Sequence, residues 1–170
     1  MLAWSMTKLL VETHASVSLT PAAKRWLALA AEIAAADLHT SVRQGMLNVM
    51  VCGDGRMRSM NREHRAKDRT TDVLSFPAQV NLRKPKNWDW IAPGVLPLGD
   101  LVISLPQARR QAKQFGVRLE EELVHLFFHG FLHLLGFDHE LSAKEEKLMQ
   151  QHEARMLESF AKLRKKRKVK

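Results

Sequence analysis

The chain has 170 residues and a formal net charge of +9, with 45% apolar and 26% charged residues. This length supports one domain with a sizeable core, and the composition is that of a soluble globular protein. The lone cysteine, Cys52, excludes an intrachain disulfide and a cysteine-based zinc site, which fits a reducing, cytoplasmic environment. Lys8 and Glu12 interrupt the apolar N-terminal residues, so we expect neither a signal peptide nor a membrane span.

The positive charge is concentrated at the C-terminus. Residues 162–170, KLRKKRKVK, carry seven positive charges and no acid, so taking these seven from +9 leaves +2 for residues 1–161. Basic runs of this kind are commonly disordered and often contact nucleic acid. We therefore expect a single domain over residues 1–161, followed by a disordered basic tail. A solvated terminus without a partner and a nuclear-import signal are the alternatives.

Strands dominate the first part of the sequence and helices the second. Thr20 can cap a helix that has Pro21 in its first turn, and Trp26, Ala30 and Ile33 recur at helical spacing. This order predicts an α+β fold, with one mixed sheet of about four strands and helices packed on it. The expected elements are, in chain order, strand 8–19, helix 20–39, strand 46–52, helix 54–64, strands 72–77 and 98–105, helices 106–115 and 118–135, and a last helix opened by the capping box at 142–145.

Residues 80–97 separate two of the expected strands. They contain three prolines together with Trp88 and Trp90. Proline-rich connections of this kind lie at the surface, so we expect a surface loop here.

The segment HGFLHLLGFDH, residues 129–139, has the spacing of a metal site. His129 and His133 lie four residues apart and therefore share one face of a helix. Gly136 can adopt the left-handed conformation that ends a helix, after which the chain can return His139 to the same point. Three nitrogen ligands with an open fourth position are typical of a catalytic zinc ion. The alternative is a set of histidines packed in the core, which would bury three imidazoles at a cost.

Two neighbours qualify this interpretation. Gly130 occupies the position at which zinc proteases with a similar spacing carry their catalytic glutamate. Either the ion alone activates water, or another residue acts from elsewhere in the chain. His125 lies one turn before His129, but 125, 129 and 133 on a straight helix cannot surround one ion. We therefore favour a supporting or packing role for His125.

A basic segment precedes one of the expected strands. The segment leads from the end of the expected helix into a strand, a place where sites often form. An arginine there can clamp a phosphate with two parallel hydrogen bonds. For Arg56, Arg58 and Arg62 we favour a solvated helix face. The cations of this segment are Arg56, Arg58, Arg62, Arg65, Lys67 and Arg69.

Three segments in this order, MNREHRAKDRTTDVLSFP (60–77), LGDLVISLP (98–106) and HGFLHLLGFDH, resemble the YbeY family of bacterial endoribonucleases. The later EEKLMQQHE (145–153) also resembles the last helix of that family. Two positions depart from the family pattern: His64 stands in place of tyrosine, and Thr70 stands in place of proline.

The resemblance implies a single-strand-specific, zinc-dependent endoribonuclease. It also implies a role in maturing ribosomal RNA, notably the 3′ end of the small-subunit RNA, and in ribosome quality control. Its partners would be RNA and the small ribosomal subunit. By the same resemblance, His129, His133 and His139 match the zinc ligands and Arg65 matches an arginine important for activity.

Four further residues are candidates for supporting these groups or facing the substrate. Asp138 adjoins His139 and could protonate the leaving oxygen, although we favour a role in orienting a ligand. The other three candidates are His125, Asp72 and Ser75.

Two other classes of function stay open at this point. A metalloprotease would have the same histidines, but Gly130 leaves it without its usual base. A non-catalytic RNA-binding factor would use zinc only to stabilise its fold, against which the open coordination position argues weakly.

Overall fold

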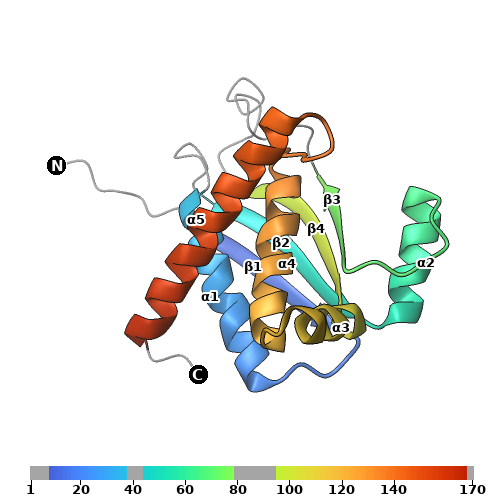
Figure 1. Cartoon of the computed structure of the whole chain (residues 1–170), viewed down its shortest axis with the longest axis horizontal. Coiled ribbons are helices and arrows are strands. Elements are labelled where there is room, and N and C mark those ends of the chain that lie inside the picture. Colours follow the sequence, from blue (N-terminus) through green and yellow to red (C-terminus); the bar gives the residue numbers. More distant parts are fainter. Residues whose placement is uncertain (1–7, 38–43, 79–94, 168–170) are drawn as a thin grey trace.

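The computed structural model describes residues 8–37, 44–78 and 95–167, and it contains one four-stranded mixed sheet (Figure 1). The strand order is β1–β2–β4–β3, in which β1, β2 and β4 run parallel and β3 runs antiparallel to β4. The expected α+β class and mixed sheet are thus confirmed. The strands are β1 (Lys8–Ala15), β2 (Gln44–Cys52), β3 (Val73–Pro77) and β4 (Leu96–Ser104).

Helices cover the two faces of the sheet unequally. The first and fourth helices pack on one face, where side chains from alternate strand positions join the main core, and the fifth helix packs on these two helices. The second helix packs on the other face over a small cluster around Met57 and Val102. The helices are α1 (Pro21–Asp37), α2 (Asp54–Arg65), α3 (Leu105–Phe115), α4 (Leu119–Leu134) and α5 (Ala143–Arg167).

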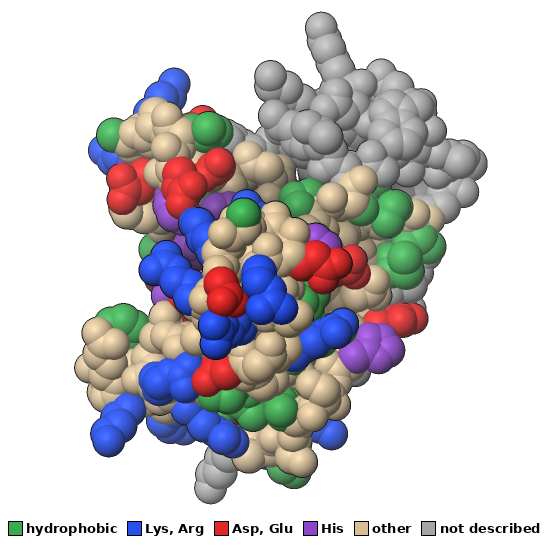
Figure 2. All heavy atoms as spheres, turned by 90° about the vertical axis from the view of Figure 1, so that its right-hand side faces the viewer, with side chains coloured by type: hydrophobic (Ala, Val, Ile, Leu, Met, Phe, Trp, Pro, Cys, Tyr) green, Lys and Arg blue, Asp and Glu red, His purple; other side chains and the backbone are tan. Residues whose placement is uncertain are grey.

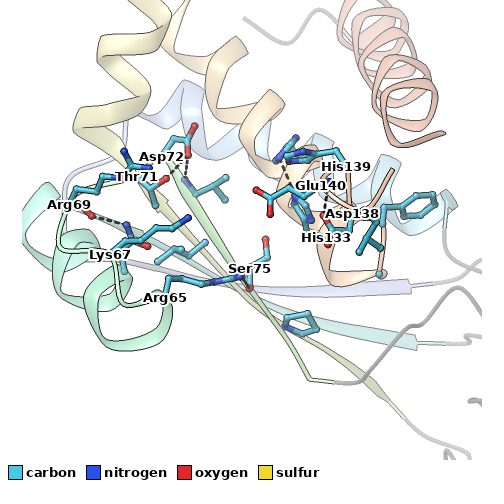
Figure 3. Close-up of a pocket in the computed structure, with 18 residues that line it drawn as sticks. Arg65, Lys67, Arg69, Thr71, Asp72, Ser75, His133, Asp138, His139 and Glu140 are labelled. Atoms are coloured by element: carbon cyan, nitrogen blue, oxygen red, sulfur yellow. Dashed lines mark hydrogen bonds between the residues drawn. The ribbon is translucent and has the colours of Figure 1, made fainter. Parts of the chain in front are cut away.

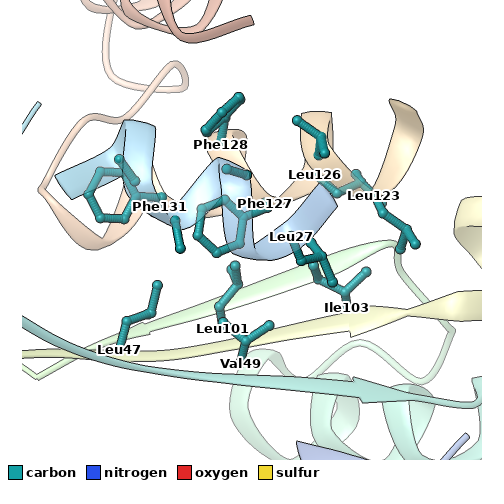
Figure 4. Packing of buried hydrophobic residues seen from close by; sticks show 14 of the residues in the cluster. Leu27, Leu47, Val49, Leu101, Ile103, Leu123, Leu126, Phe127, Phe128 and Phe131 are labelled. Atoms are coloured by element: carbon teal, nitrogen blue, oxygen red, sulfur yellow. The ribbon is translucent and has the colours of Figure 1, made fainter. Parts of the chain in front are cut away.

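α4 is the central helix of the core (Figure 4). Its Phe127 and Phe131 side chains are 1% and 0% exposed, and their rings stack on each other on the side of the sheet that α4 covers. From the sheet, Val49 and Leu101 point toward them (Figure 4). Replacing a phenylalanine of this kind by alanine typically costs about 3–5 kcal/mol, so these rings hold α4 firmly against the sheet.

The local signals for helix ends act as the sequence predicted. The Thr20 hydroxyl oxygen accepts a hydrogen bond from the Ala23 backbone nitrogen at 3.0 Å, and α1 begins at Pro21. Gly116 ends α3 with a φ of 68°, and Gly136 follows α4 with a φ of 91°. The Ser142 hydroxyl accepts from the Glu145 backbone nitrogen at the start of α5. These caps place the turn after α4 that carries part of the site.

Element boundaries differ by a few residues from the expectation. β1 ends at Ala15, short of the predicted residue 19, and β4 begins at Leu96, inside the stretch predicted as loop. Residues 80–94 of that predicted loop, with Trp88 and Trp90, lie outside the described residues. No helix in the described ranges is long and apolar enough to cross a membrane.

The basic tail differs more. α5 continues through Arg167, so most of the tail that we expected to be disordered is helical, and residues 168–170 lie outside the described part. Lysine and arginine are good helix formers, and positive charge is favourable at a helix C-terminus. Arg164 lies 3.3 Å from Glu121 and Arg167 lies 2.7 Å from Glu32, which holds these turns against the body of the protein.

Candidate metal centre and cationic pocket

The three histidines of the motif meet at the C-terminal end of α4. His129 and His133 project from successive turns, and the chain reverses after Gly136 so that His139 joins them. One ring nitrogen from each histidine lies within 4.8 Å of the others. The spacing in the sequence therefore does produce a three-histidine group that could hold a metal ion.

The ring orientations suit a common ligand. His129 Nδ1 lies 3.1 Å from a Glu153 carboxylate oxygen on α5, which directs His129 Nε2 toward His133 Nε2 at 3.2 Å. In a tetrahedral site with metal–nitrogen bonds of about 2.0–2.1 Å, ligand nitrogens stand about 3.3 Å apart. The donor set and this one measured separation thus fit a zinc-like ion.

Glu153 was not among the residues that the sequence singled out. Burial opposes its ionisation, but hydrogen bonds with His125 and His129 prevail and lower the pKa of Glu153 to about 2. A carboxylate that accepts a proton from a ligating imidazole fixes its tautomer and raises its basicity. The resemblance covers this part of α5, but only the fold shows that Glu153 reaches His129.

His125 contacts the same carboxylate from the outer side. Its ring nitrogens lie 3.8 Å from Glu122 and 3.5 Å from Glu153, and these two acids raise the pKa of His125 to about 10. A protonated imidazole has no lone pair for a metal. The supporting role that we favoured for His125 is therefore consistent with its position.

Gly130 is explained by the packing of α4 against the sheet. A β-carbon at this position would overlap Leu101 Cδ1 and lie 3.1 Å from both Ser75 Oγ and Val73 Cγ2. The face of α4 that holds residue 130 is therefore pressed against β3 and β4. A glutamate here would not fit unless Leu101 moved, so the general base of the zinc proteases is absent for a reason of packing.

Ser75 takes part in this contact. Its side chain is buried, and the hydroxyl donates to the Gly130 carbonyl oxygen at 3.0 Å. Ser75 also lines the pocket beside the histidines (Figure 3). The hydrogen bond from its hydroxyl to Gly130 connects β3 to α4.

Asp138 organises the turn that carries His139. Its carboxylate accepts a hydrogen bond from the Glu140 backbone nitrogen at 2.9 Å. The side chain thus acts on the backbone of the turn. The contact is to the backbone and not to a histidine ring, so the choice between orienting a ligand and acid catalysis stays a prediction.

Across the pocket from the histidines, cations from the end of α2 and the following loop form the opposite wall (Figure 3). The pocket encloses about 550 Å³. Ala66 has a φ of 55°, which turns the chain sharply after Arg65. The buried Asn61 amide donates to the Arg69 carbonyl oxygen at 2.8 Å and fixes the returning loop. Arg65, Lys67 and Arg69 are the cations of this wall.

Other cations of the same segment are neutralised locally. Arg58 makes two hydrogen bonds to Asp68, at 2.9 and 2.8 Å, and Arg62 adds a third at 3.3 Å. Neither Arg58 nor Arg62 lines the pocket. Figure 2, which faces this side, shows basic and acidic side chains interspersed here. The solvated-face interpretation holds for these two arginines.

The departures from the family pattern leave the loop well anchored. The Thr70 hydroxyl donates to Asp54 at 3.2 Å, and Asp54 also accepts from Ser104 and from Arg110. The Arg110 hydrogen bond is the largest cause of the lowered pKa of Asp54. His64 packs edge-on against Phe76, with ring centroids 5.0 Å apart. The hydrogen bonds around Asp54 therefore hold the loop beside Arg65, in which Thr70 stands where the family pattern has a proline.

Asp72 lies at the start of β3 on the pocket wall. Its carboxylate accepts from the Gln111 amide at 2.8 Å, the Val73 backbone nitrogen at 2.8 Å and the Thr71 hydroxyl at 3.0 Å. Burial acts to raise the pKa of Asp72, but these donors prevail and lower it. Asp72 thus joins α3 to the pocket wall as an ionised group.

Fold and site together define an α+β protein whose three-histidine group, able to hold a metal ion, faces a cationic pocket wall. A family model described as Endoribonuclease YbeY matches residues 11–161. The chain therefore belongs to the endoribonuclease YbeY family.

Individual relatives agree with this assignment. The endoribonuclease YbeY of Persephonella marina is 40% identical over 111 residues, covering 65% of this chain and 67% of the relative. That of Leptospira interrogans is 44% identical over 119 residues, covering 66% and 84%. The solution structure of a Thermotoga maritima protein shares the fold, with a TM-score of 0.62 at 22% identity over 92% of this chain and 93% of that one.

Proposed function

We propose that this protein is a zinc-dependent endoribonuclease that cleaves single-stranded RNA. The observation that carries the proposal is the placement of the three-histidine group opposite Arg65, Lys67 and Arg69 in one pocket. A phosphodiester is anionic, so a cation-lined wall facing a metal site suits it better than a neutral peptide bond. The family to which the chain belongs carries the name of this activity.

In this proposal His129, His133 and His139 hold the ion, and Glu153 and Asp138 orient His129 and the turn of His139. A zinc ion bound there would supply a water of near-neutral pKa and polarise a phosphoryl oxygen. Because the packing at Gly130 excludes a glutamate, the chain itself contributes no carboxylate from that position.

Arg65 is the residue that we assign to the transition state. Its guanidinium lies within hydrogen-bond reach of the Ser75 carbonyl oxygen, at 3.4 Å, on the wall opposite the histidines. The contact is long and uses one of its five donors, and among the described residues the other four have no hydrogen-bond partner, so they can bind phosphate. Fixed positive charge aimed at the developing phosphoryl oxyanion lowers the barrier. Asp72 and Ser75 hold the strand on which this geometry depends.

The substrate that we propose is ribosomal RNA in the cytoplasm. The motifs that carry the family resemblance imply maturation of the small-subunit RNA 3′ end and ribosome quality control, with the small ribosomal subunit as partner. Mapping ribosomal RNA ends in cells with and without the protein tests this role. Unchanged 3′ ends in cells lacking the protein would count against it.

The activity itself is tested with purified protein. Single-stranded RNA and casein are each incubated with the protein, with and without a chelator. We expect the protein to cleave RNA and not casein. Chelation should abolish the cleavage of RNA, and added zinc should restore it. Casein cleavage without RNA cleavage would favour the protease alternative, and binding of RNA without cleavage would favour the non-catalytic one.

A further inference from the structure

The last turns of α5 extend beyond the region that the family model matches, which ends at residue 161. Two arginines hold these turns against the protein. Arg164 stacks over the Trp26 ring, 4.6 Å from its centroid, and pairs with Glu121 at 3.3 Å. Arg167 pairs with Glu32 at 2.7 Å. The extension is therefore a docked helix with a fixed orientation.

This orientation separates the basic residues of the last turns into two sets: the two arginines, which pair with acids on other helices, and the lysines, which do not. Lys162, Lys165 and Lys166 are spaced at i, i+3 and i+4, so they share the exposed side of the helix, and we call them the lysine face. Lys162 pairs with Glu158 at 2.7 Å, but both side chains are mostly exposed, and such pairs contribute little. Neither Lys165 nor Lys166 has an ion pair with any residue in the described ranges.

The apolar side of α5 is already used. Met156 and Phe160 are buried in the core, and Leu163 packs against it. A helix that binds a lipid bilayer inserts an apolar face, and this one has none to offer. The lysine face can therefore recognise a partner only through charge, which fits a polyanion.

We propose that the lysine face is a second contact for the RNA backbone, remote from the metal centre. The inference rests on the proposed action on RNA. α5 starts just after the turn that carries His139, and at about 1.5 Å per residue the lysine face lies roughly 30 Å farther along the helix. Figure 1 shows the two ends of α5 at opposite sides of the molecule. A strand long enough to reach both places gains affinity that a short strand cannot.

The test compares three variants of the full chain. The first is Lys162→Gln with Lys165→Gln and Lys166→Gln, and the second changes the same lysines to arginine. The third removes three exposed lysines from separate surfaces, Lys24, Lys113 and Lys144, by the same change to glutamine. Binding is measured across a salt series with a long unstructured single strand of DNA, which an endoribonuclease leaves intact.

Each phosphate contact to a single strand contributes about −0.7 to the slope of log affinity against log salt, so losing three contacts flattens the slope by about 2. We expect this change in the first variant and wild-type slopes in the arginine variant. The third variant should change the slope less than the first. Equal slopes for the first and third variants would overturn the proposal.

Cleavage and lipid binding supply separate readouts. With a short RNA the first variant should keep its kcat and KM, whereas with a long RNA its KM should rise. If no form of the protein cleaves RNA, the proposed function fails, but the binding slopes still decide on the lysine face. Binding of phosphatidylserine vesicles that depends on the same lysines, with unchanged slopes on the nucleic acid, would assign the face to a membrane instead.

Discussion

The Ser75 hydroxyl donates a hydrogen bond to the Gly130 carbonyl oxygen at 3.0 Å, and this bond joins the edge strand β3 to the helix that carries two of the three histidines. The contact has α4 close to the sheet, where a β-carbon at position 130 would overlap Leu101 Cδ1 and force that side chain to shift. The position at which zinc proteases keep their catalytic base is therefore a packing position in this protein. The packing that brings α4 against β3 and β4 therefore also leaves little room for a side chain at that position.

Gly130→Ala should destabilise the protein. A β-carbon would collide with Leu101 and crowd Ser75 and Val73, and overpacking of a core typically costs about 1–3 kcal/mol, of which the gain of roughly 0.5–1 kcal/mol from alanine within a helix offsets a part. Gly55→Ala in α2 is the matched control, because no atom lies within 4 Å of its β-carbon, and alanine there should be neutral or stabilising. Urea denaturation of both variants measures the difference. Equal stability of the two would contradict the packing explanation.

Glu153→Gln should weaken metal binding while preserving the fold. The amide cannot accept the proton of His129 as a carboxylate does, and losses of this kind typically cost about 10–100-fold in affinity. Glu146→Gln, on the exposed part of the same helix, should leave affinity unchanged. Competition against a chromophoric chelator gives both constants. Wild-type affinity in Glu153→Gln would show that the carboxylate is dispensable for the site.

The metal centre and its surroundings differ in how far the sequence predicted them. The spacing of His129, His133 and His139 is a local pattern, and helix geometry with a turn at Gly136 converts it directly into a three-histidine group. Glu153 is 24 residues from His129, and only the packing of α5 on α4 brings the two together. Such a distance carries no periodicity that a sequence pattern could reveal.

For most of the C-terminal segment the prediction of disorder was wrong, because α5 continues through Arg167. The density of charge in residues 162–170 predicted disorder, because a run of like charges repels itself. In the folded protein that repulsion is relieved where Arg164 pairs with Glu121 and Arg167 pairs with Glu32. These acids lie on α1 and α4, far away in the sequence. The helical extension therefore depends on tertiary contacts that composition could not show.

Asp54 should make the stability of the protein depend on pH. Its hydrogen bonds, that from Arg110 above all, lower the pKa of Asp54 from its ordinary value of 3.8. A lowered folded-state pKa gives stability that is present above pH 3.8 and is lost as the pH falls through the folded-state pKa. Asp54→Asn should therefore be less stable than wild type near neutral pH, by at most about 1 kcal/mol because the site is partly exposed.

The pH series for Asp54 uses urea denaturation at about pH 6 and about pH 3. The gap between wild type and Asp54→Asn should narrow at the lower pH, because the wild-type carboxylate is then becoming protonated. Glu12→Gln on the exposed surface should show a smaller gap at both values. If the stability gap for Asp54→Asn widened on acidification, the predicted direction of the pH dependence would be wrong.

Arg65 gives the most direct test of the pocket. Arg65→Ala should lose most RNA cleavage while keeping the metal and the fold, because the guanidinium lies on the wall opposite the histidines and its loss removes the positive charge that we assign to the developing oxyanion. Arg65→Lys should recover little, since an ammonium group cannot make the planar two-pronged contact with phosphate.

Arg62→Ala is the matched control: it lies on the same helix, but its guanidinium binds Asp68 and does not line the pocket. Single-turnover cleavage of a short RNA, with metal content and melting temperature recorded for each variant, separates loss of chemistry from loss of structure. Near-wild-type rates in both Arg65 variants, or an equal loss in Arg62→Ala, would remove Arg65 from the transition state.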